Sequence, residues 1–599
     1  MNDDSLGSLD LPKTLRDRIL CRALDDSDSV TNNKNKAFVL YLPTVVLRHR
    51  HNPAFALACR LANHCNIPVV VLCTTLDDRH LSRTPINDHA ISMTARRLAF
   101  TLEALQSACL EWEQHGAGVA IRVHGPGART PHHLTLIHQA AAVVTDEPFV
   151  EPHRTYMSRI VLTCQAAKIP CWSCDGSTTV PPKSLLKLVA RKDGDITFSG
   201  VSAKAWSWEK KTEPFREAQV YGTVRDGHLD APLLQNRLPA NFILATATSD
   251  TERFQEQVSK AMPVNWKDIK TPCPGQRPWT VEELIAIHAK EWVMTSWPGA
   301  DTSVPPCVQT SGSSEAATKR WKHFVQTHLK SYAKRRNMIM DPLAVSRMSC
   351  YLNMGIISIM DVIHDVWQAR SSQAGCKEGC RKFLDEVVKW REVGYVYTFA
   401  SPHFPTVEAI PKWAHASLER QRGSRGAGFS YEQLESATTQ DEKWNAMQDY
   451  LIETGELHNN ARMPWGKTVV HWQSTKFTPE EVLWQMCCLN DRFALDGLSP
   501  PSYAGLLWCF GWCDKPAAGG SVSTKPAHRY RSGPAAFLKA KEALYNPGVD
   551  SSPSSSGENK KGESPKKKTK HEGIAKSPSS KAITSYFSPV PAKGLAGNF

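Results

Sequence analysis

Short apolar runs and amphipathic stretches alternate along the first third of the chain. From Phe38, β-branched runs (FVLYLPTVVL, IPVVVLC, GVAIRVHG, AAVVTD and IPCWSC) are separated by segments with helical periodicity, such as 53–65 and 91–115. Buried strands that alternate with helices are typical of a parallel sheet with crossover helices. We therefore predict a parallel-sheet α/β domain over residues 36–180.

The pattern changes after Pro181. Strand-like runs fade, and between about Thr280 and Cys513 amphipathic helical segments carry most of the eighteen tryptophans. We predict an interdomain linker region at 181–279 and an all-α domain at 280–525.

Both ends of the chain lack a sustained apolar period. Residues 1–35 are rich in Asp, Ser and Asn, so we predict a disordered leader and a fold that starts near Lys36. Residues 526–599 are predicted to be a mostly disordered basic tail, because Ser, Pro and Lys dominate after Gly548.

Composition excludes several classes of protein. The chain has 599 residues, 41% hydrophobic and 22% charged, which fits two or three domains and excludes disorder throughout. No apolar run approaches the roughly eighteen residues that span a bilayer, so we expect a soluble intracellular protein with no membrane contact, and a monomer.

The seventeen cysteines are scattered, which favours reduced thiols. Cys171 and Cys174 have metal-like spacing but no second pair follows, so no metal site is predicted.

The net charge of +13 is uneven. The last 49 residues hold nine lysines and three glutamates, a net charge of +6, so the rest of the chain is only mildly basic and supports nucleic-acid binding weakly. The lysine cluster at 560–570 fits a nuclear-import signal, and equally a solvated tail. We expect a nuclear protein.

The tail ends with three apolar residues at helical spacing, Ile583, Tyr586 and Phe587. The segment resembles the peptide that docks on the replicative sliding clamp, although Ser580 stands where glutamine is usual. A clamp contact and a chance match in a polar tail both remain open.

Two segments carry the first chemical signal: Tyr332-Ala-Lys-Arg-Arg-Asn, and Val345-Ser-Arg-Met-Ser-Cys-Tyr-Leu-Asn-Met-Gly355. Ser346 and Ser349, near a helix start, can hold a diphosphate to which Tyr332 offers its hydroxyl. This resembles the flavin-binding segment of the photolyase and cryptochrome family. The motifs FLDEVVKWRE, YEQLESATTQDEKWNAMQ, TGELHNNARMPW, LNDRFALDG and SYAGLLW follow in the family's order and look most like class II cyclobutane pyrimidine dimer photolyases.

The resemblance covers about 36–515 and is strongest after Trp321. It implies a Rossmann-like antenna domain followed by an all-α domain that binds FAD, with an antenna chromophore that is a deazaflavin, a folate or absent. The residues that match the family's FAD contacts are Tyr332, Val345, Ser346, Arg347, Met348, Ser349, Arg462, Asn490, Asp491 and Asp496.

Three of these have a specific implied role. Arg462 would pair with an acid across the flavin ring, with Asp496 the first candidate and Asp491 the second, and a cation there favours the reduced anionic flavin. Asn490 matches an amide that faces the reactive ring nitrogen. Without the resemblance the charged residues are a structural ion-pair network.

The resemblance also implies residues that serve the DNA lesion. Glu386 would hydrogen-bond the thymine carbonyls of a flipped dimer, and Trp390, one helical turn further, would form an apolar wall. Asn459, after His458, is like the lesion-contacting pair of other photolyase classes, and Met463 completes the predicted catalytic set.

Three tryptophans form the predicted electron path. From spacing alone, Trp444, Trp465 and Trp472 are core residues. The resemblance implies that they carry electrons to the flavin, with Trp465 proximal, Trp444 in the middle and Trp472 terminal.

The chain departs from the class II pattern in two places. Ser499-Pro-Pro501-Ser502 stands where Asp-Pro-Asn-Gly is usual, and this stiffer turn could shift Asp496. Ala517 lies where the family places a tryptophan. We predict a deoxyribodipyrimidine photo-lyase that splits cyclobutane dimers in UV-damaged DNA with photoexcited reduced FAD; the preference over 6-4 products comes from class alone. A cryptochrome-like blue-light receptor and a light-independent DNA-binding flavoprotein remain open.

Overall fold

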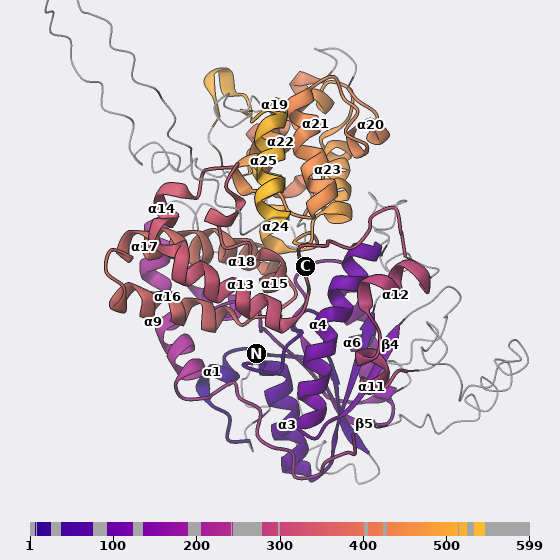
Figure 1. Ribbon diagram of the computed structural model, residues 1–599. Coiled ribbons are helices and arrows are strands. Elements are labelled where there is room, and N and C mark those ends of the chain that lie inside the picture. Colours follow the sequence, from indigo (N-terminus) through magenta and orange to yellow (C-terminus); the bar gives the residue numbers. More distant parts are fainter. Residues whose placement is uncertain are drawn as a thin grey trace, which may run out of the picture.

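The structure is a computed structural model of the chain. It describes residues 6, 9–24, 37–75, 93–123, 136–189, 205–240, 242, 278–297, 300–400, 405–422, 428–512, 514, 516–523 and 532–545. An α/β domain forms one end of the molecule and helices form the other (Figure 1). The α/β fold followed by a helical region is therefore confirmed.

Six strands make one sheet in the order β1-β6-β5-β2-β3-β4. All neighbouring strands are parallel except β1 and β6. The strands are β1 (Ile19–Ala23), β2 (Phe38–Leu42), β3 (Val69–Thr75), β4 (Gly118–Val123), β5 (Ala140–Asp146) and β6 (Cys171–Cys174).

Helices cover both faces of this sheet. Alternate residues of β2 point to opposite cores: Val39 and Tyr41 join the cluster that includes α3 (Pro53–Cys65) and α4 (Ala95–Gln114), whereas Leu40 packs with α6 (His153–Ala167). Burial on both faces explains why the strands read as unbroken apolar runs.

The predicted leader is wrong for residues 9–24. They form α1 (Lys13–Arg16) and strand β1, which pairs with β6. Leu11 and Leu15 are buried, and the buried Arg18 donates to the carbonyl oxygen of Thr179 (2.8 Å). Leu9, Leu11, Leu15 and Ile19 join the core, but β1 is fixed by a strand partner about 150 residues away, so its pairing cannot be read locally.

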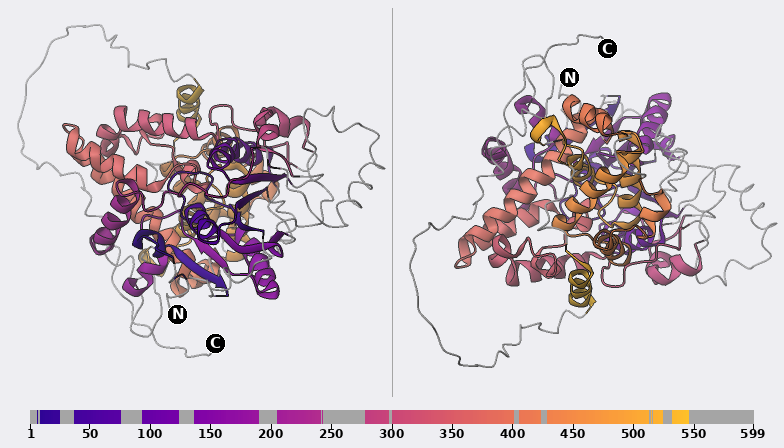
Figure 2. Two further views of the ribbon diagram at one scale, coloured as in Figure 1. Left: turned by 90° about the horizontal axis from the view of Figure 1, so that it is seen from below. Right: turned by 90° about the horizontal axis from the view of Figure 1, so that it is seen from above.

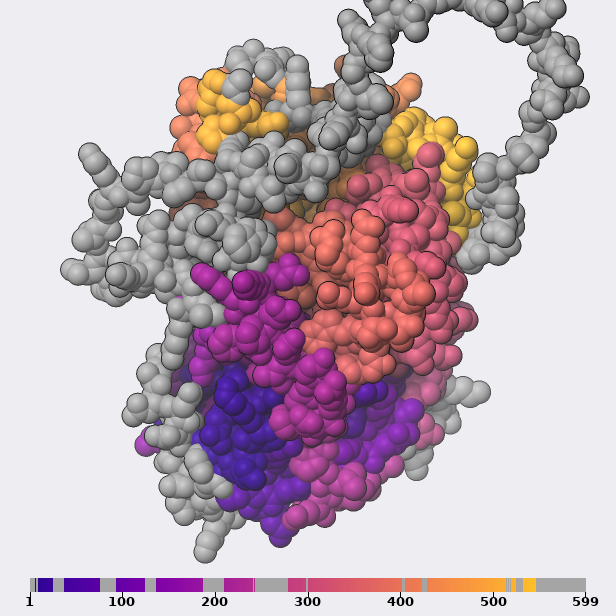
Figure 3. Space-filling view, turned by 90° about the vertical axis from the view of Figure 1, so that its left-hand side faces the viewer, coloured from indigo at the N-terminus to yellow at the C-terminus, as the bar shows by residue number. Residues whose placement is uncertain are grey.

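The predicted linker also contains structure. It holds α7 (Pro182–Val189) and α9 (Ala205–Val224), and α9 packs against α16 (Ile359–Ser372). Figure 3 shows the magenta of this region against the salmon of the helical domain. Arg216 of α9 lies 3.8 Å from buried Glu392, so α9 is part of the packed body.

Most of the remaining helices build the second domain, with α19 to α25 in the upper part of Figure 1 and nearest the viewer in the right-hand view of Figure 2. Helices α11 (Val281–Ile285) and α12 (Ala289–Thr295) instead pack on α4 of the α/β domain. The α-helices are α11 (Val281–Ile285), α12 (Ala289–Thr295), α13 (Ser314–Thr327), α14 (Tyr332–Arg335), α15 (Ser349–Asn353), α16, α17 (Lys377–Leu384), α18 (Glu392–Ala400), α19 (Lys412–Gln421), α20 (Tyr431–Glu435), α21 (Glu442–Thr454), α22 (Asn459–Gln473), α23 (Pro479–Phe493), α24 (Pro500–Cys509) and α25 (Pro534–Tyr545). Short 3₁₀ turns are η3 (Leu329–Ser331), η4 (Pro342–Ala344), η6 (Val407–Ala409) and η7 (Ala518–Gly520).

Helix α25 corrects the predicted tail. Phe537, Ala540 and Leu544 are buried at helical spacing, and the helix packs on α21 and η4. The predicted disorder is therefore wrong for 534–545. The lysine cluster at 560–570 and the clamp-like Ile583, Tyr586 and Phe587 lie outside the described residues.

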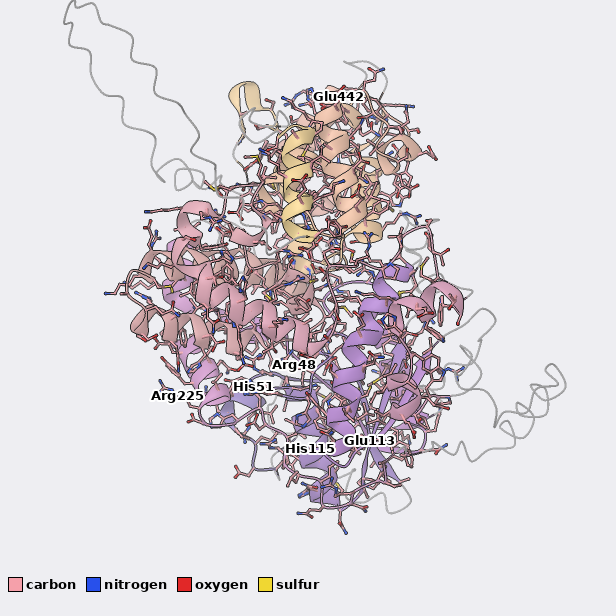
Figure 4. All side chains as sticks on the ribbon, viewed as in Figure 1. Arg48, His51, Glu113, His115, Arg225 and Glu442 are labelled. Carbon is pink, nitrogen blue, oxygen red and sulfur yellow. The ribbon has the colours of Figure 1, made fainter. Side chains whose placement is uncertain are left out.

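Buried arginines join the two domains. Arg48 donates to the carbonyl oxygens of Gly355 (2.8 Å) and Gly176 (2.9 Å), and His51 Nδ1 lies 3.3 Å from Asp361 Oδ2; Figure 4 labels Arg48 and His51 at this junction. The domains are thus held in one arrangement by bonds to buried backbone. Within the described part of the chain, no helix is long and apolar enough to cross a membrane.

Candidate functional site

A cavity of about 310 Å³ lies within the helical domain. Its walls come from α14, the segment 345–353, the start of α18 with the preceding π-helical segment η5 (Asp385–Arg391), the turn between α21 and α22, and residues 495–505. Predicted site residues that line it are Tyr332, Val345, Ser346, Arg347, Met348, Ser349, Glu386, Asn459, Arg462 and Asp496.

One buried acid organises the segment 345–349. Glu456 Oε2 accepts from Arg347 Nε (2.6 Å) and its Oε1 from Arg347 Nη2 (2.7 Å), while Thr310 Oγ1 donates to Oε1 (2.9 Å). Burial alone would raise the pKa of Glu456, but the charges of Arg347 and Arg320 hold it at about 2. The pair fixes Arg347, which has a left-handed φ of 54°. Sequence reasoning missed Glu456, although it stands inside the quoted TGELHNNARMPW motif.

The hydroxyl groups expected at the diphosphate are available at the cavity wall. Ser346 is half-buried and Ser349 is exposed at the start of α15. Among the described residues, neither hydroxyl has a protein hydrogen-bond partner. Tyr332 packs against Phe324 and Phe383, and burial raises the pKa of its phenol. These side chains can bind an anionic ligand without breaking bonds already made.

The predicted arginine–acid pair is present, with Asp496 as the acid. Arg462 Nη2 lies 2.8 Å from Asp496 Oδ1. Asp491 is instead buried, accepts from Tyr503 Oη (2.7 Å) and Leu498 N (2.8 Å), and does not line the cavity. Its role is to hold the turn that follows Asp496.

Asn490 also lies outside the cavity lining. Its amide donates to Ser502 Oγ (2.7 Å), and Ser502 lines the cavity. In this arrangement Asn490 reaches the cavity wall through Ser502, and the structure does not place its side chain among the lining residues.

Glu386 lines the cavity with Arg336 and also pairs with Lys382, which is not a lining residue. Arg336 Nη2 lies 3.0 Å and Lys382 Nζ 2.8 Å from Glu386 Oε1. The sequence predicts an ordinary helix here, but η5 is a π-helix, a form that is rare and often marks functional sites. Glu392, just beyond η5, accepts from the backbone N–H of Thr179 (2.6 Å) and anchors it to the first domain.

Trp390 does not line the cavity. It is half-buried, and its ring meets that of Trp508 edge to face at a centroid distance of 5.0 Å. Sequence reasoning missed Trp508 as its partner, although Trp508 closes the quoted SYAGLLW motif. Met463 is likewise absent from the lining.

His458 and Asn459 line the cavity beside each other. Burial lowers the pKa of His458 to about 4, so its ring is neutral at neutral pH. Its Nδ1 accepts from Asn460 N (3.1 Å), while its buried Nε2 has no protein partner in the described structure. A buried nitrogen without a partner points to a ligand in the cavity.

The three tryptophans of the predicted electron path are in contact. The centroids of Trp444 and Trp465 are 6.3 Å apart, and those of Trp444 and Trp472 are 5.7 Å apart. Trp465 and Trp444 are fully buried, whereas Trp472 is partly exposed. Trp444 thus contacts both other rings and Trp472 is the exposed member, while their role in electron transfer stays a prediction.

The unusual turn is the start of a helix. Ser499 caps α24, its Oγ accepting from Ser502 N (3.3 Å), and Pro500 and Pro501 occupy the first helical positions, where a missing N–H costs nothing. The second proline therefore fits the fold, and the Arg462–Asp496 pair forms beside it. Ala517 is exposed and does not line the cavity.

Potential metal ligands lie elsewhere. Cys171 and Cys174 are buried in β6, and the pKa of each thiol is raised, by contact with Cys164 for Cys171 and by burial for Cys174. His415, Glu419 and Glu480 place ligand atoms within 4.8 Å of one another. Glu480 lies 3.7 Å from His415 and Glu419 lies 3.4 Å from Arg422, so ion pairs account for this cluster.

Comparisons with known proteins agree with this architecture. The DNA photolyase family model matches residues 39–217. The chain is similar to the deoxyribodipyrimidine photo-lyases of Methanothermobacter thermautotrophicus (32% identity, covering 36% of this chain and 46% of that protein) and Oryza sativa subsp. japonica (31% identity, covering 51% and 62%). Among solved structures, a cryptochrome from Synechocystis sp. PCC6803 shares the fold, with a TM-score of 0.53, 12% identity, and coverage of 86% of this chain and 87% of that one.

These similarities support the photolyase/cryptochrome family for this chain, a family whose members generally bind FAD. The sequence alignments span about half the length of these relatives, 46% and 62% respectively.

Proposed function

We propose that the chain is a deoxyribodipyrimidine photo-lyase that binds UV-damaged DNA and splits cyclobutane pyrimidine dimers in blue light with reduced FAD. One observation carries the proposal: Glu386 and its partner Arg336 line the same cavity as segment 345–349 and the Arg462–Asp496 pair. A flavin site and a lesion site thus share one space. The relatives named deoxyribodipyrimidine photo-lyase support the same activity.

The cavity residues fit FAD. Four guanidinium groups face three carboxylates around it, which leaves positive charge for an anionic dinucleotide; the groups are those of Arg336, Arg347, Arg391 and Arg462 against Glu386, Glu456 and Asp496. Buried nitrogens of His458 and Arg391 have no protein partner in the described structure. When bound, FAD supplies light absorption and the electron that opens the cyclobutane ring and then returns.

Each wall has a distinct task in this proposal. Ser346 and Ser349 hold the diphosphate, and Tyr332 closes that end of the cavity. Arg462, partly neutralised by Asp496, lies beside the flavin ring and favours its reduced anionic form electrostatically. The Arg347–Glu456 ion pair holds the segment 345–349 in place. Because the two charges neutralise each other, the pair does not contribute charge to the ligand.

Glu386 and its cations match the edge of a pyrimidine. A thymine ring presents one N–H donor between two carbonyl acceptors, so the Glu386 carboxylate can accept while Arg336 and Lys382 donate. Charge that develops on the dimer as it takes up an electron is stabilised by those cations. The dimer reaches this edge by leaving the duplex, which costs less for a poorly stacked lesion than for normal bases.

The edge-to-face pair of Trp390 and Trp508 begins four residues after Glu386 and lies outside the residues that line the cavity. Aromatic rings bury large apolar area and stack on bases. We assign this pair to the wall against which the flipped dimer packs.

Photoreactivation by the purified, photoreduced protein tests the proposal. A thymine-dimer oligonucleotide is exposed to blue light or kept in darkness, and the remaining dimer is measured. We expect loss of dimer only in the light, slowed at least about tenfold by Glu386→Gln, which keeps the shape but removes the charge. Glu442→Gln, an exposed position at the top of the molecule in Figure 4, is the control. Bound, photoreducible FAD without repair would contradict the proposal and favour a blue-light receptor.

We also propose a nuclear location and a contact with the sliding clamp, both on the sequence of the tail. A fluorescent fusion of the full chain, with lysines 566–568 replaced by alanine, tests the first; nuclear fluorescence should fall. Replacing Ile583, Tyr586 and Phe587 by alanine tests the second, and co-purification with the clamp should be lost.

A further inference from the structure

Two exposed methionines are flanked in sequence by residues that line the cavity. Arg336 and Pro342 line the cavity, and between them Met338 and Met340 are 52% and 54% exposed. Exposed apolar patches rimmed by polar residues mark interaction sites, which makes these two methionines candidates for contact with a ligand.

The turn that carries these methionines is held rigidly. Ile339, between them, is buried in the core cluster that contains Trp444 and Trp465. Met338 N donates to Arg335 O (2.8 Å) and Asp341 N to Met338 O (3.1 Å), and Arg335 pairs with Asp341. Because the backbone is fixed, the two side chains project from one position with little ordering cost.

Exposed cations lie on the segment before the pair and on the helix packed against that segment. Exposed Lys330 and Lys334 lie on either side of Tyr332, and α17, which packs against α14, exposes Lys377 and Arg381. The methionines and these four exposed cations therefore lie on the same or neighbouring elements, where Glu378 of α17 is the exposed acid. This combination suits double-stranded nucleic acid, because cations bind phosphates while apolar side chains can enter the base stack.

We propose that Met338 and Met340 form a wedge that enters the duplex where the dimer has left it. Removing two adjacent pyrimidines leaves a gap of about 7 Å along the strand, at 3.4 Å per base. Methionine is long, unbranched and apolar, so a pair can fill such an irregular gap and prevent the dimer from returning to the stack. This inference rests on the proposed repair function and specifies how the duplex is held open.

The experiment compares two kinds of DNA. The double variant Met338→Gln/Met340→Gln keeps the length of both side chains but makes them polar. We measure its affinity for a dimer in a duplex and for the same dimer in a single strand. We expect the duplex affinity to fall about tenfold, since flipping costs a few kcal/mol, and the single-strand affinity to change less than about twofold. Met338→Leu/Met340→Leu should restore most of the duplex affinity. Met294→Ala, 41% exposed on α12, controls for loss of a surface methionine.

The outcomes separate the wedge from the repair function. Equal losses on both DNA forms would show a structural effect, and unchanged duplex affinity would show that the methionines stay outside the stack; either result overturns the wedge. If the wild-type protein neither distinguishes damaged from intact DNA nor repairs it, the proposed function itself fails. Melting temperatures of both double variants, compared with wild type, exclude misfolding.

Discussion

The indole planes of Trp444 and Trp465 lie within 13° of parallel, with ring centroids 6.3 Å apart. Hydrogen bonds fix this geometry: Trp444 Nε1 donates to the Trp465 carbonyl oxygen (3.1 Å), and Trp465 Nε1 donates to Gln448 Oε1 (2.9 Å). Trp472 meets the other side of Trp444 at 5.7 Å. Trp444 is thus the bridging ring between a buried and a partly exposed tryptophan.

Replacing the bridging ring should interrupt electron supply without removing the flavin. We expect Trp444→Phe to slow photoreduction of bound FAD at least about tenfold, because phenylalanine is far harder to oxidise and breaks the path in its middle. The measurement is loss of oxidised-flavin absorbance in blue light with an external reductant. Trp367→Phe, on α16, is the matched control. Equal rates in both variants would exclude Trp444 from the path.

The Arg462–Asp496 pair should set the redox potential of the flavin. In Asp496→Asn the guanidinium is no longer neutralised at 2.8 Å, so the reduced anionic flavin gains stabilisation. We expect the two-electron midpoint potential to rise by about 30 mV, equivalent to about 1.4 kcal/mol. Spectroelectrochemical titration measures the shift. Glu442→Gln removes the same charge from an exposed site and should leave the potential unchanged; a lower potential in Asp496→Asn would contradict the assignment.

Features that depend on residues close together in the chain were predictable from the sequence, whereas features that depend on distant residues were not. The sheet was predictable because strands such as β2 are buried on both faces and read as apolar runs. The Arg462–Asp496 pair and the sequence of contacts from Trp465 through Trp444 to Trp472 were expected from the resemblance of the motifs to a known family. Glu456 was missed because its partner, Arg347, is 109 residues away and nothing in either sequence neighbourhood specifies the pairing.

Other differences have the same cause. Strand β1 is recognisable only through its pairing with β6, and the leucines before it, Leu9, Leu11 and Leu15, follow no regular strand or helix period. The π-helix at Glu386 depends on tertiary anchoring through Glu392, which a periodicity of 3.6 does not reveal. The double proline at 500–501 looked like a disruption but is the first turn of α24.

Glu456 should make stability depend on acid pH. Its pKa in the fold is about 2, below the ordinary 4.5, because Arg347 and Arg320 outweigh the effect of burial. A lowered carboxyl pKa stabilises the fold above about 4.5, and this contribution is lost as the pH falls from 4.5 towards 2. Urea unfolding of wild type should therefore show stability falling across this window.

Glu456→Gln should remove the contribution of this carboxyl group to the fall in stability between pH 4.5 and 2. At neutral pH the free energy of unfolding should drop by about 3 kcal/mol, because Arg347 is left without its partner. Glu378→Gln, an exposed acid on α17, should keep the wild-type profile. An unchanged slope in Glu456→Gln would mean that other carboxylates account for the acid sensitivity.

Helix α25 should stabilise the cavity wall, although it lies in the segment predicted to be disordered. Phe537 is buried and its ring lies 5.5 Å from that of Tyr450, which lines the cavity. We expect Phe537→Ala to cost about 3 kcal/mol, to lower the melting temperature by roughly 5 °C, and to weaken FAD retention during gel filtration. Leu538→Ala removes the adjacent, 54% exposed side chain and should leave both unchanged, since it buries little apolar area. If the two variants behave alike, or if limited proteolysis removes 534–545 from the wild-type protein without loss of FAD, α25 does not support the cavity.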